Sequence, residues 1–455
     1  MINLEKYVSS YLWKGLDILR GYFDSGVAQR IYIECLFIKL LNEELTVGNS
    51  YFTNKIKGRL DFDVIRNNPQ EFLKELDEFI HSNEILDGLF SEISRLREIN
   101  ENRVLGEFLS LFNEIHCSEY KSEIEDGSIF RYFIDVIFRS SKINTKTSPS
   151  INLLISRLLE NIKMKSIYDP TIGTGSLITK VTSIHDGVEI YGQDINNDMV
   201  SICKMLLILE ERIEDVTNIY QGNTLVNPGN VYEGELQKFD CIVCNPAFAL
   251  KDWGYNEVAT VDKYNRFHRG LPSKSLGDYA FITHVVECLN YKGRAIMVEP
   301  SGVLFREGAE GAIREQLIKE NIIDCIIALP NNMMYGTALP VNLLIFNMNK
   351  FTEDILFIDV TKKVESSKRL TTLSDEIMRE ISNIYECRLS IEGFSRVVNI
   401  NELENNNCNL NVQRYIEDTK VRDELNIIEI NNNIRYLQDK LSNIQNEISR
   451  YFNNI

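Results

Sequence analysis

The sequence predicts an α/β protein in three parts: an all-helical N-terminal domain, a doubly wound sheet domain and a C-terminal coiled-coil-like helix. Three observations predict this organisation. Apolar residues recur at spacings of three and four over residues 1–140, β-rich runs alternate with helical runs over 141–420, and a heptad seam runs through 421–455. The chain has 455 residues, of which 44% are hydrophobic and 25% charged. Those values are typical of a folded protein and exclude a disordered chain.

The N-terminal part is predicted to be all-helical. Its first helix covers residues 4–23, and the cluster Asp24-Ser25-Gly26 separates it from a second helix at 27–41. Further amphipathic stretches without strand-like alternation follow at residues 72–80, 85–99 and 104–115.

The middle part alternates strands with helices. Strands are predicted at residues 166–168, 189–192, 240–243, 294–298, 322–328 and 343–347. Helical patterns lie between them at residues 177–184, 198–211, 279–289 and 309–320. This alternation predicts a parallel, doubly wound sheet whose ligand site lies at the carboxyl ends of the strands.

The C-terminal part carries the clearest helical periodicity in the chain. Its apolar positions are Ile427, Ile430, Ile434, Leu437, Leu441, Ile444, Ile448, Tyr451 and Ile455. Two interpretations are open, a terminal helix docked on its own domain and a helix paired with a partner, and the heptad seam favours the partner.

The charge balance limits how the chain could bind nucleic acid. Asp and Glu total 66 against 49 Lys and Arg, which gives a net charge of −17. Because such a chain repels phosphate on average, a role on DNA requires a local basic groove or a basic partner subunit.

Compartment and metal content are also constrained. The first residues lack the pattern of a signal peptide and the sequence lacks an apolar run of membrane-spanning length, so we expect a cytoplasmic protein that contacts no membrane. Cys241 and Cys244 fall on one predicted strand, where residues three apart point to opposite faces. A metal site is therefore not expected there.

The first candidate site is a glycine turn where a strand passes into a helix. It reads Asp169-Pro170-Thr171-Ile172-Gly173-Thr174-Gly175-Ser176. Gly173 and Gly175 would permit a tight turn and close approach of a ligand, although an ordinary structural turn is an equal alternative.

Two later strand ends add candidate nucleotide contacts. Asp194 stands about 20 positions after the glycine turn, where a carboxylate accepts hydrogen bonds from ribose hydroxyls. Ile195 would pack beside an adenine ring. Asp194 could instead cap the helix that starts near Asn196, and Asn223 could contact adenine or form a turn.

The most informative segment is Asn245-Pro246-Ala247-Phe248, directly after an apolar strand. The Asn245 amide oxygen and the Pro246 carbonyl would accept the two N–H bonds of an exocyclic amine, and Phe248 would stack on its base. This arrangement suits methylation of that amine. The alternative is an Asn-Pro turn followed by a core phenylalanine.

These motifs together resemble the modification (M) subunit of type I restriction-modification systems, an adenine-N6 DNA methyltransferase. The turn at 169–177 is similar to that family's S-adenosylmethionine loop, and 245–248 is similar to its Asn-Pro-Pro-Phe motif. Further similar segments are Leu12 to Gly21, Gly302 to Gly311, Leu329 to Pro340 and Asn409 to Tyr415.

Three positions depart from the family pattern. Ala247 stands where a second proline is usual, so the loop loses one φ constraint. Asn223 stands where Asp is frequent, and Ser148-Pro149 where Thr-Pro usually precedes the cofactor site.

The resemblance implies a Rossmann-like methyltransferase domain that uses S-adenosyl-L-methionine and needs no metal. With the reasoning above, it assigns catalysis to Asn245, Pro246 and Phe248. The cofactor-binding residues expected are Ser148, Pro149, Asp169, Thr171, Gly173, Gly175, Ser176, Asp194, Ile195 and Asn223. It also implies base flipping of the target adenine.

The implied partners are DNA, a specificity subunit, a second copy of this chain and, where cleavage occurs, a restriction subunit. A specificity subunit that recognises DNA would supply the DNA affinity that this acidic chain is not expected to have by itself. Two other interpretations are open: a catalytically weak cofactor-binding scaffold of a defence complex, suggested by Ala247, and a methyltransferase acting on protein or RNA.

Overall fold

The computed structural model describes residues 4–115, 129–140, 147–334, 337–364 and 370–416, and seven positions between Ile434 and Ile444. The heptad positions Ile427, Ile430, Ile448, Tyr451 and Ile455, and Tyr335 and Gly336 of the family-like segments, lie outside these ranges.

The N-terminal part is helical, as predicted. Its α-helices are α1 (Leu4–Leu19), α2 (Ser25–Thr46), α3 (Ser50–Thr53), α4 (Val64–Asn67), α5 (Pro69–His81), α6 (Asn102–Asn113) and α7 (Ile129–Ser140). The long helix α2 begins where Asp24 accepts hydrogen bonds from the backbone N–H groups of Gly26 and Val27. It contacts α1, α6 and α7 and forms the centre of this part.

The prediction of a continuous amphipathic stretch at 85–99 was wrong. Two short 3-10 helices, Glu84–Leu86 and Ile93–Glu98, occupy it. Gly88 has a φ of +69° and interrupts the helical backbone. The buried Glu34 carboxylate then accepts the backbone N–H groups of Ser91, Glu92 and Ile93, and these bonds replace helical ones.

The remaining described chain forms a nine-stranded mixed sheet, in the order β11-β10-β8-β9-β7-β6-β1-β2-β3. The strands are β1 (Ser166–Asp169), β2 (Glu189–Asp194), β3 (Ile219–Gln221), β6 (Phe239–Cys244), β7 (Leu289–Pro300), β8 (Ile323–Ala328), β9 (Val341–Asn347), β10 (Asp354–Asp359) and β11 (Ser395–Asn399). A small hairpin, β4 (Val231–Tyr232) and β5 (Glu235–Leu236), stands apart from this sheet.

The prediction that all strands run parallel is wrong for β9, the strand expected at residues 343–347. The pairs that join β3, β2, β1, β6 and β7 are parallel, whereas β9 is antiparallel to both β7 and β8. The chain returns from β8 to β9 through 329–340 instead of crossing over through a long helix, so the direction reverses. Both strands are buried throughout, which explains why their sequences read as continuous apolar runs.

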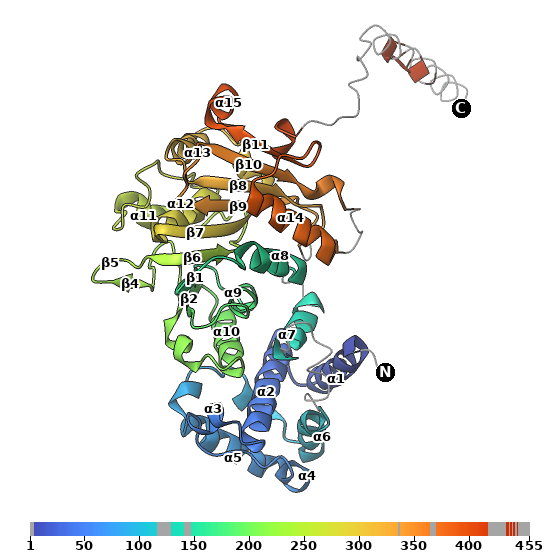
Figure 1. Cartoon of the computed structure of the whole chain (residues 1–455). Coiled ribbons are helices and arrows are strands. Elements are labelled where there is room, and N and C mark those ends of the chain that lie inside the picture. Colours follow the sequence, from blue (N-terminus) through green and yellow to red (C-terminus); the bar gives the residue numbers. More distant parts are fainter. Residues whose placement is uncertain are drawn as a thin grey trace.

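Helices cover both faces of the sheet, which confirms the doubly wound α/β class (Figure 1). The core on one face includes α8 (Pro149–Leu159), α9 (Ser176–Thr182), α10 (Asn197–Leu209) and α14 (Asp375–Cys387). The core on the other includes α11 (Tyr255–Thr260), α12 (Asp278–Cys288), α13 (Ala309–Lys319) and α15 (Ile400–Asn405). Cys241 lies in the first core and Cys244 in the second, on opposite faces of β6 as expected.

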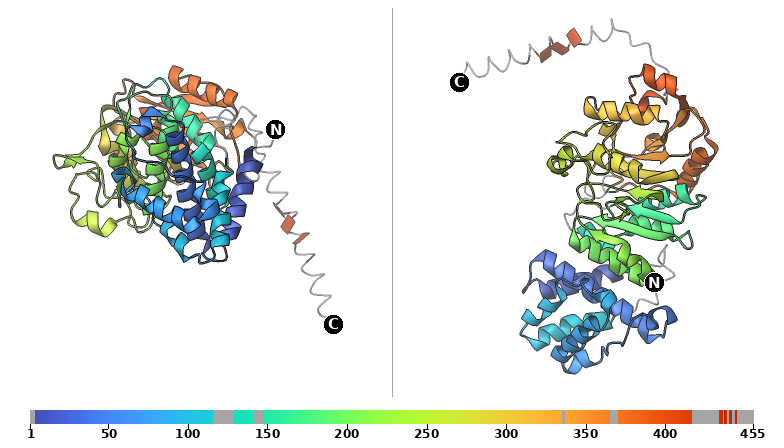
Figure 2. Two further views of the ribbon diagram at one scale, coloured as in Figure 1. Left: turned by 90° about the horizontal axis from the view of Figure 1, so that it is seen from below. Right: turned by 90° about the vertical axis from the view of Figure 1, so that its left-hand side faces the viewer.

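The N-terminal helices pack at one end of the molecule, against α10. Figure 2 shows these blue helices below the green α10 and away from the orange end of the sheet. Arg30 on α2 pairs with Glu34 and donates to the Asp198 carbonyl oxygen at the start of α10, at 3.0 Å. One apolar core therefore runs from the helices onto one face of the sheet.

Among the residues that the structure describes, no helix is long and apolar enough to cross a membrane. The described tail residues Ile434, Leu437, Leu441 and Ile444 are helical and 46–61% exposed, so they do not dock on the rest of the described chain.

Candidate active site

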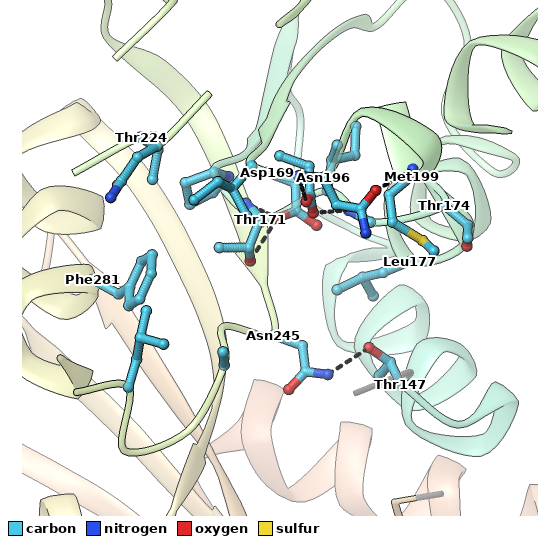
Figure 3. A pocket seen from close by; sticks show the side chains of 18 of the residues that line it. Thr147, Asp169, Thr171, Thr174, Leu177, Asn196, Met199, Thr224, Asn245 and Phe281 are labelled. Carbon is cyan, nitrogen blue, oxygen red and sulfur yellow. Dashed lines mark hydrogen bonds between the residues drawn. The ribbon is translucent and has the colours of Figure 1, made fainter. Parts of the chain in front are cut away.

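A cavity of about 380 Å³ opens at the carboxyl edge of the sheet, where β1, β2, β3 and β6 end (Figure 3). It brings together many of the residues singled out in the sequence. Those that line it are Asp169, Thr171, Gly173, Ser176, Asp194, Ile195, Asn223 and Asn245. The expected edge of the sheet therefore holds the cavity, because parallel strands bring these distant turns side by side.

The glycine turn is built by close packing on α10. Gly175 has a φ of +79° and directly precedes α9. A Cβ on Gly175 would lie 2.7 Å from Cys203 Sγ, and a Cβ on Gly192 would lie 2.3 Å from Ile172 Cδ1. Gly175 itself is not a lining residue, and it acts by letting the turn pack closely behind the cavity.

Asp169 is a buried acid at the edge of the cavity, with 2% of its surface exposed. Its Oδ1 accepts the Thr171 backbone N–H at 2.9 Å. Burial raises the pKa of Asp169 to about 8, and the nearby Asp194 adds to that rise, while the bonds from Thr171 oppose it. A cationic ligand beside Asp169 would favour its ionised form.

Asp194 fixes the turn from the neighbouring strand. Its Oδ2 accepts the Gly173 N–H at 2.9 Å and its Oδ1 accepts the Asn196 N–H at 2.8 Å. Burial raises the pKa of Asp194, and these hydrogen bonds lower it. Asn196, rather than Asp194, caps α10 by accepting the N–H groups of Asp198 and Met199. Ile195 beside it is 66% exposed.

Asn223 joins two walls of the cavity. Its Oδ1 accepts the Leu225 N–H at 2.9 Å and so forms a turn, while its Nδ2 donates to the Trp253 carbonyl oxygen at 3.2 Å. Arg266 supports the same turn by donating to the carbonyl oxygens of Thr224 and Leu225. Asn223 provides a donor here that an aspartate would lack.

Asn245 stands at the end of β6 with a fixed side chain. Its Nδ2 donates to Thr147 Oγ1 at 2.9 Å, across 98 residues of sequence. Figure 3 shows the Asn245 amide nitrogen facing Thr147 and its oxygen on the opposite side of the amide. In the same turn Pro246 is buried and Ala247 is exposed and lines the cavity. Phe248 is half-buried against the sheet core and does not line the cavity.

Ser148 and Pro149 begin a helix instead of lining the cavity. The Ser148 hydroxyl caps α8 by accepting the Ile151 N–H, and Pro149 is the first helical residue. Their neighbour Thr147 lines the cavity. Phe281 of α12 also lines it, and no sequence signal separated Thr147 or Phe281 from ordinary loop and core residues.

The model of the N-6 DNA methylase family matches residues 129–424. The type I restriction enzyme MjaVIII methylase subunit of Methanocaldococcus jannaschii is 28% identical over 456 residues, covering 94% of this chain and 76% of that protein. The MpnII methylase subunit of Mycoplasma pneumoniae is 23% identical over 525 residues, covering 97% and 95% of the two chains.

Solved structures share the fold. The type I restriction-modification methyltransferase subunit from Streptococcus thermophilus has a TM-score of 0.76 at 23% identity, covering 91% of this chain and 100% of that one. A chain from a study of type I R-M complex assembly has a TM-score of 0.61 at 17% identity, covering 99% of both chains. The predicted α/β methyltransferase fold, adenine-specific DNA methylation and use of S-adenosylmethionine are confirmed with these findings. The chain belongs to the N-6 DNA methylase family.

Proposed function

We propose that the chain transfers a methyl group from S-adenosylmethionine to N6 of a flipped adenine, through Asn245, Pro246 and Phe248, as the modification subunit of a type I complex. The observation that carries this assignment is the hydrogen bond from Asn245 Nδ2 to Thr147, at the wall of the cavity that the glycine turn also lines. Because the amide nitrogen donates to Thr147, the amide oxygen, which is the acceptor that a bound amine requires, faces the other way.

The residues around the cavity fit S-adenosylmethionine. A volume of about 380 Å³ is within the range of small-molecule sites. Asp169 offers a buried acidic group to a cationic ligand, and the packing of Gly175 on Cys203 keeps the turn close to α10. When bound, the cofactor supplies an electrophilic methyl group on a sulfonium.

Each binding residue then has a distinct role. Asp169 and Thr171 bind the charged end of the cofactor, with Gly173, Gly175 and Ser176 forming the turn beneath it. Asp194 accepts hydrogen bonds from ribose hydroxyls, Ile195 packs on adenine, and Asn223 shapes the adenine wall through its turn. Ser148 and Pro149 contribute indirectly, by starting α8 directly after Thr147.

The catalytic turn acts on the target amine. The Asn245 Oδ1 and the Pro246 carbonyl oxygen accept the two N6–H bonds and stabilise the positive charge that develops on N6. Phe248 stacks on the flipped base, which requires its half-buried ring to turn from the core toward the cavity. The N6 proton then leaves to solvent.

The acidic chain works with other subunits in this proposal. A specificity subunit supplies sequence recognition, two copies of this chain join it in the cytoplasm, and a restriction subunit joins when DNA is cleaved. The net charge of −17 supports a partner that supplies affinity for DNA. The exposed apolar positions Leu437 and Leu441 support a partner helix on the tail. We propose the division into a helical domain at 1–140, a methyltransferase domain at 141–420 and a partner-binding helix at 421–455.

The test is transfer of labelled methyl groups to unmethylated DNA by the chain with its specificity subunit. We expect label in N6-methyladenine with the wild-type chain, and a change of less than about threefold in kcat for Ala247→Pro, because Ala247 is exposed and Asn245 keeps its bond to Thr147. Activity that arises only with Ala247→Pro would instead support the scaffold role, and no label in any variant would contradict the proposal.

The raised pKa of Asp169 predicts a pH-dependent stability. A carboxyl whose folded pKa is about 8, against 3.8 as its ordinary value, stabilises the protein fully below about pH 4. That contribution is lost as pH rises through about 8. Since one pKa unit corresponds to about 1.4 kcal/mol, we expect ligand-free Asp169→Asn to lie within about 1 kcal/mol of wild type at pH 4.5 and to exceed it at pH 8.5 by about 5 kcal/mol in free energy of unfolding. Denaturant unfolding across this range measures it, and parallel pH profiles would contradict it.

A further inference from the structure

The catalytic turn is held at both of its ends by buried polar groups from other elements. At its start Asn245 donates to Thr147, and at its far end the Ala249 backbone N–H donates to Asp278 Oδ1 at 2.7 Å. Asp278 is the first residue of α12 and is 1% exposed. One step further, the Gly277 N–H donates to the Leu250 carbonyl oxygen at 2.9 Å. The start of α12 therefore holds residues 249–250 by two hydrogen bonds.

Ala249 needs this support because of its backbone conformation. Its φ is +50°, in the left-handed region that non-glycine residues rarely adopt. The other non-glycine residues with positive φ in the described chain are Asn, Glu, Arg and Cys. Alanine has no side-chain polar group that could stabilise this conformation locally. An external hydrogen bond acceptor is the remaining source of stabilisation.

Asp278 is itself held in one orientation by its partners. Its Oδ2 pairs with the Arg306 guanidinium, whose Nε bonds Glu310 Oε2 at 2.5 Å. Asp278 and Glu310 are both buried, and Arg306 lies between them. A charged acceptor held in this way makes a stronger bond to a backbone N–H than a neutral one.

The same helix also forms part of the cavity. Phe281 lies one turn after Asp278, on the same face of α12, and lines the same cavity as Asn245 (Figure 3). Leu250 and Ala247 line it from the turn. Movement of the turn away from Asp278 would therefore change the direction of Asn245 at the catalytic end of the cavity.

We propose that Asp278, oriented by Arg306 and Glu310, is a positioning residue that holds the catalytic turn through Ala249 in the conformation that methyl transfer requires. The proposal rests on the catalytic role assigned to Asn245. It predicts a loss in kcat without a loss in cofactor binding, because Asp169 ends β1, Asp194 ends β2 and the glycine turn joins β1 to α9, and none of these elements carries Asp278 or the catalytic turn.

The test compares Asp278→Asn with Asp324→Asn in the complex with the specificity subunit. The asparagine introduced by Asp278→Asn would present an amide NH₂ group to Arg306 and lose the ion pair. We expect kcat to fall by about 10- to 100-fold with the KM for S-adenosylmethionine unchanged. Asp324 is the matched control, since it is also buried and paired with an arginine, Arg388, but lies on β8 away from the cavity. Its variant should lose stability and keep kcat.

Two variants at Ala249 test the same link without disturbing the ion pair. Ala249→Val puts a β-branched residue at an exposed position with positive φ, so it should lower kcat in a chain that still folds. Asparagine tolerates that φ better than alanine. Ala249→Asn introduced into Asp278→Asn should therefore raise kcat at least threefold above that of Asp278→Asn alone.

Each result decides the proposal. Wild-type kcat in Asp278→Asn, or in Ala249→Val if Asp278→Asn does not fold, would overturn it, as would an equal loss of kcat in Asp324→Asn. A wild-type complex that methylates DNA, with Asn245→Ala inactive, would show in the same assay that the proposed function stands even if the role of Asp278 fails.

Discussion

Replacing Asn245 with alanine is expected to lower kcat for methyl transfer to DNA by about 100- to 1,000-fold. The proposed reaction develops positive charge on N6, and the Asn245 oxygen is the side-chain acceptor that stabilises it. The Thr147 hydroxyl orients this amide at 2.9 Å, so Thr147→Val should lower kcat by about 10-fold while Thr147→Ser retains most activity. Single-turnover transfer of labelled methyl groups measures all three.

Cofactor binding separates a catalytic effect from a folding defect in this series. Asn245→Ala should bind S-adenosylmethionine within about threefold of wild type, because Asp194 holds the glycine turn through the Gly173 N–H, a bond that this substitution leaves in place. Asn161→Ala is the control, since Asn161 bonds Glu386 at the surface and does not line the cavity. Near-normal methylation by Asn245→Ala would assign the chemistry to another group.

Gly175→Ala is expected to disrupt both stability and cofactor binding. The new Cβ would lie 2.7 Å from Cys203 Sγ, and alanine would have to adopt a φ of +79°. Strain and overpacking together should lower the free energy of unfolding by about 3 kcal/mol. The turn would also shift away from α10, so we expect affinity for S-adenosylmethionine to fall more than about 10-fold. Denaturant unfolding and calorimetry measure the two effects.

Two further variants separate strain from the clash. Gly187 has a φ of +67° and no neighbouring atom within 4 Å of the place that an added Cβ would take. Gly187→Ala should therefore cost only about 1 kcal/mol and leave cofactor affinity unchanged. Cys203→Ala introduced into Gly175→Ala removes the clashing sulfur and should recover about half of the lost stability. No recovery would show that the clash with Cys203 is not the cause.

Local patterns in the sequence were sufficient to locate the cavity. Asp169 and Asp194 end the runs that became β1 and β2, Asn245 directly follows β6, and parallel strands place such ends at one edge. The direction of β9 was not predictable in this way, because a buried apolar run has the same periodicity whichever way the strand points. The helix expected at 85–99 failed because Glu34, distant in sequence, binds the backbone there.

The sequence by itself determined the order of the elements and the chemistry of the motifs, since both depend on residues near one another in the chain. Only the tertiary structure decided which groups orient that chemistry. Thr147 reaches Asn245 across 98 residues, and Asp278 reaches Ala249 across 29. Neither contact has a local signature, because a threonine before a helix cap and an aspartate at a helix start are explained equally well by helix capping. Folding brings these polar groups together, and burial makes their hydrogen bonds selective.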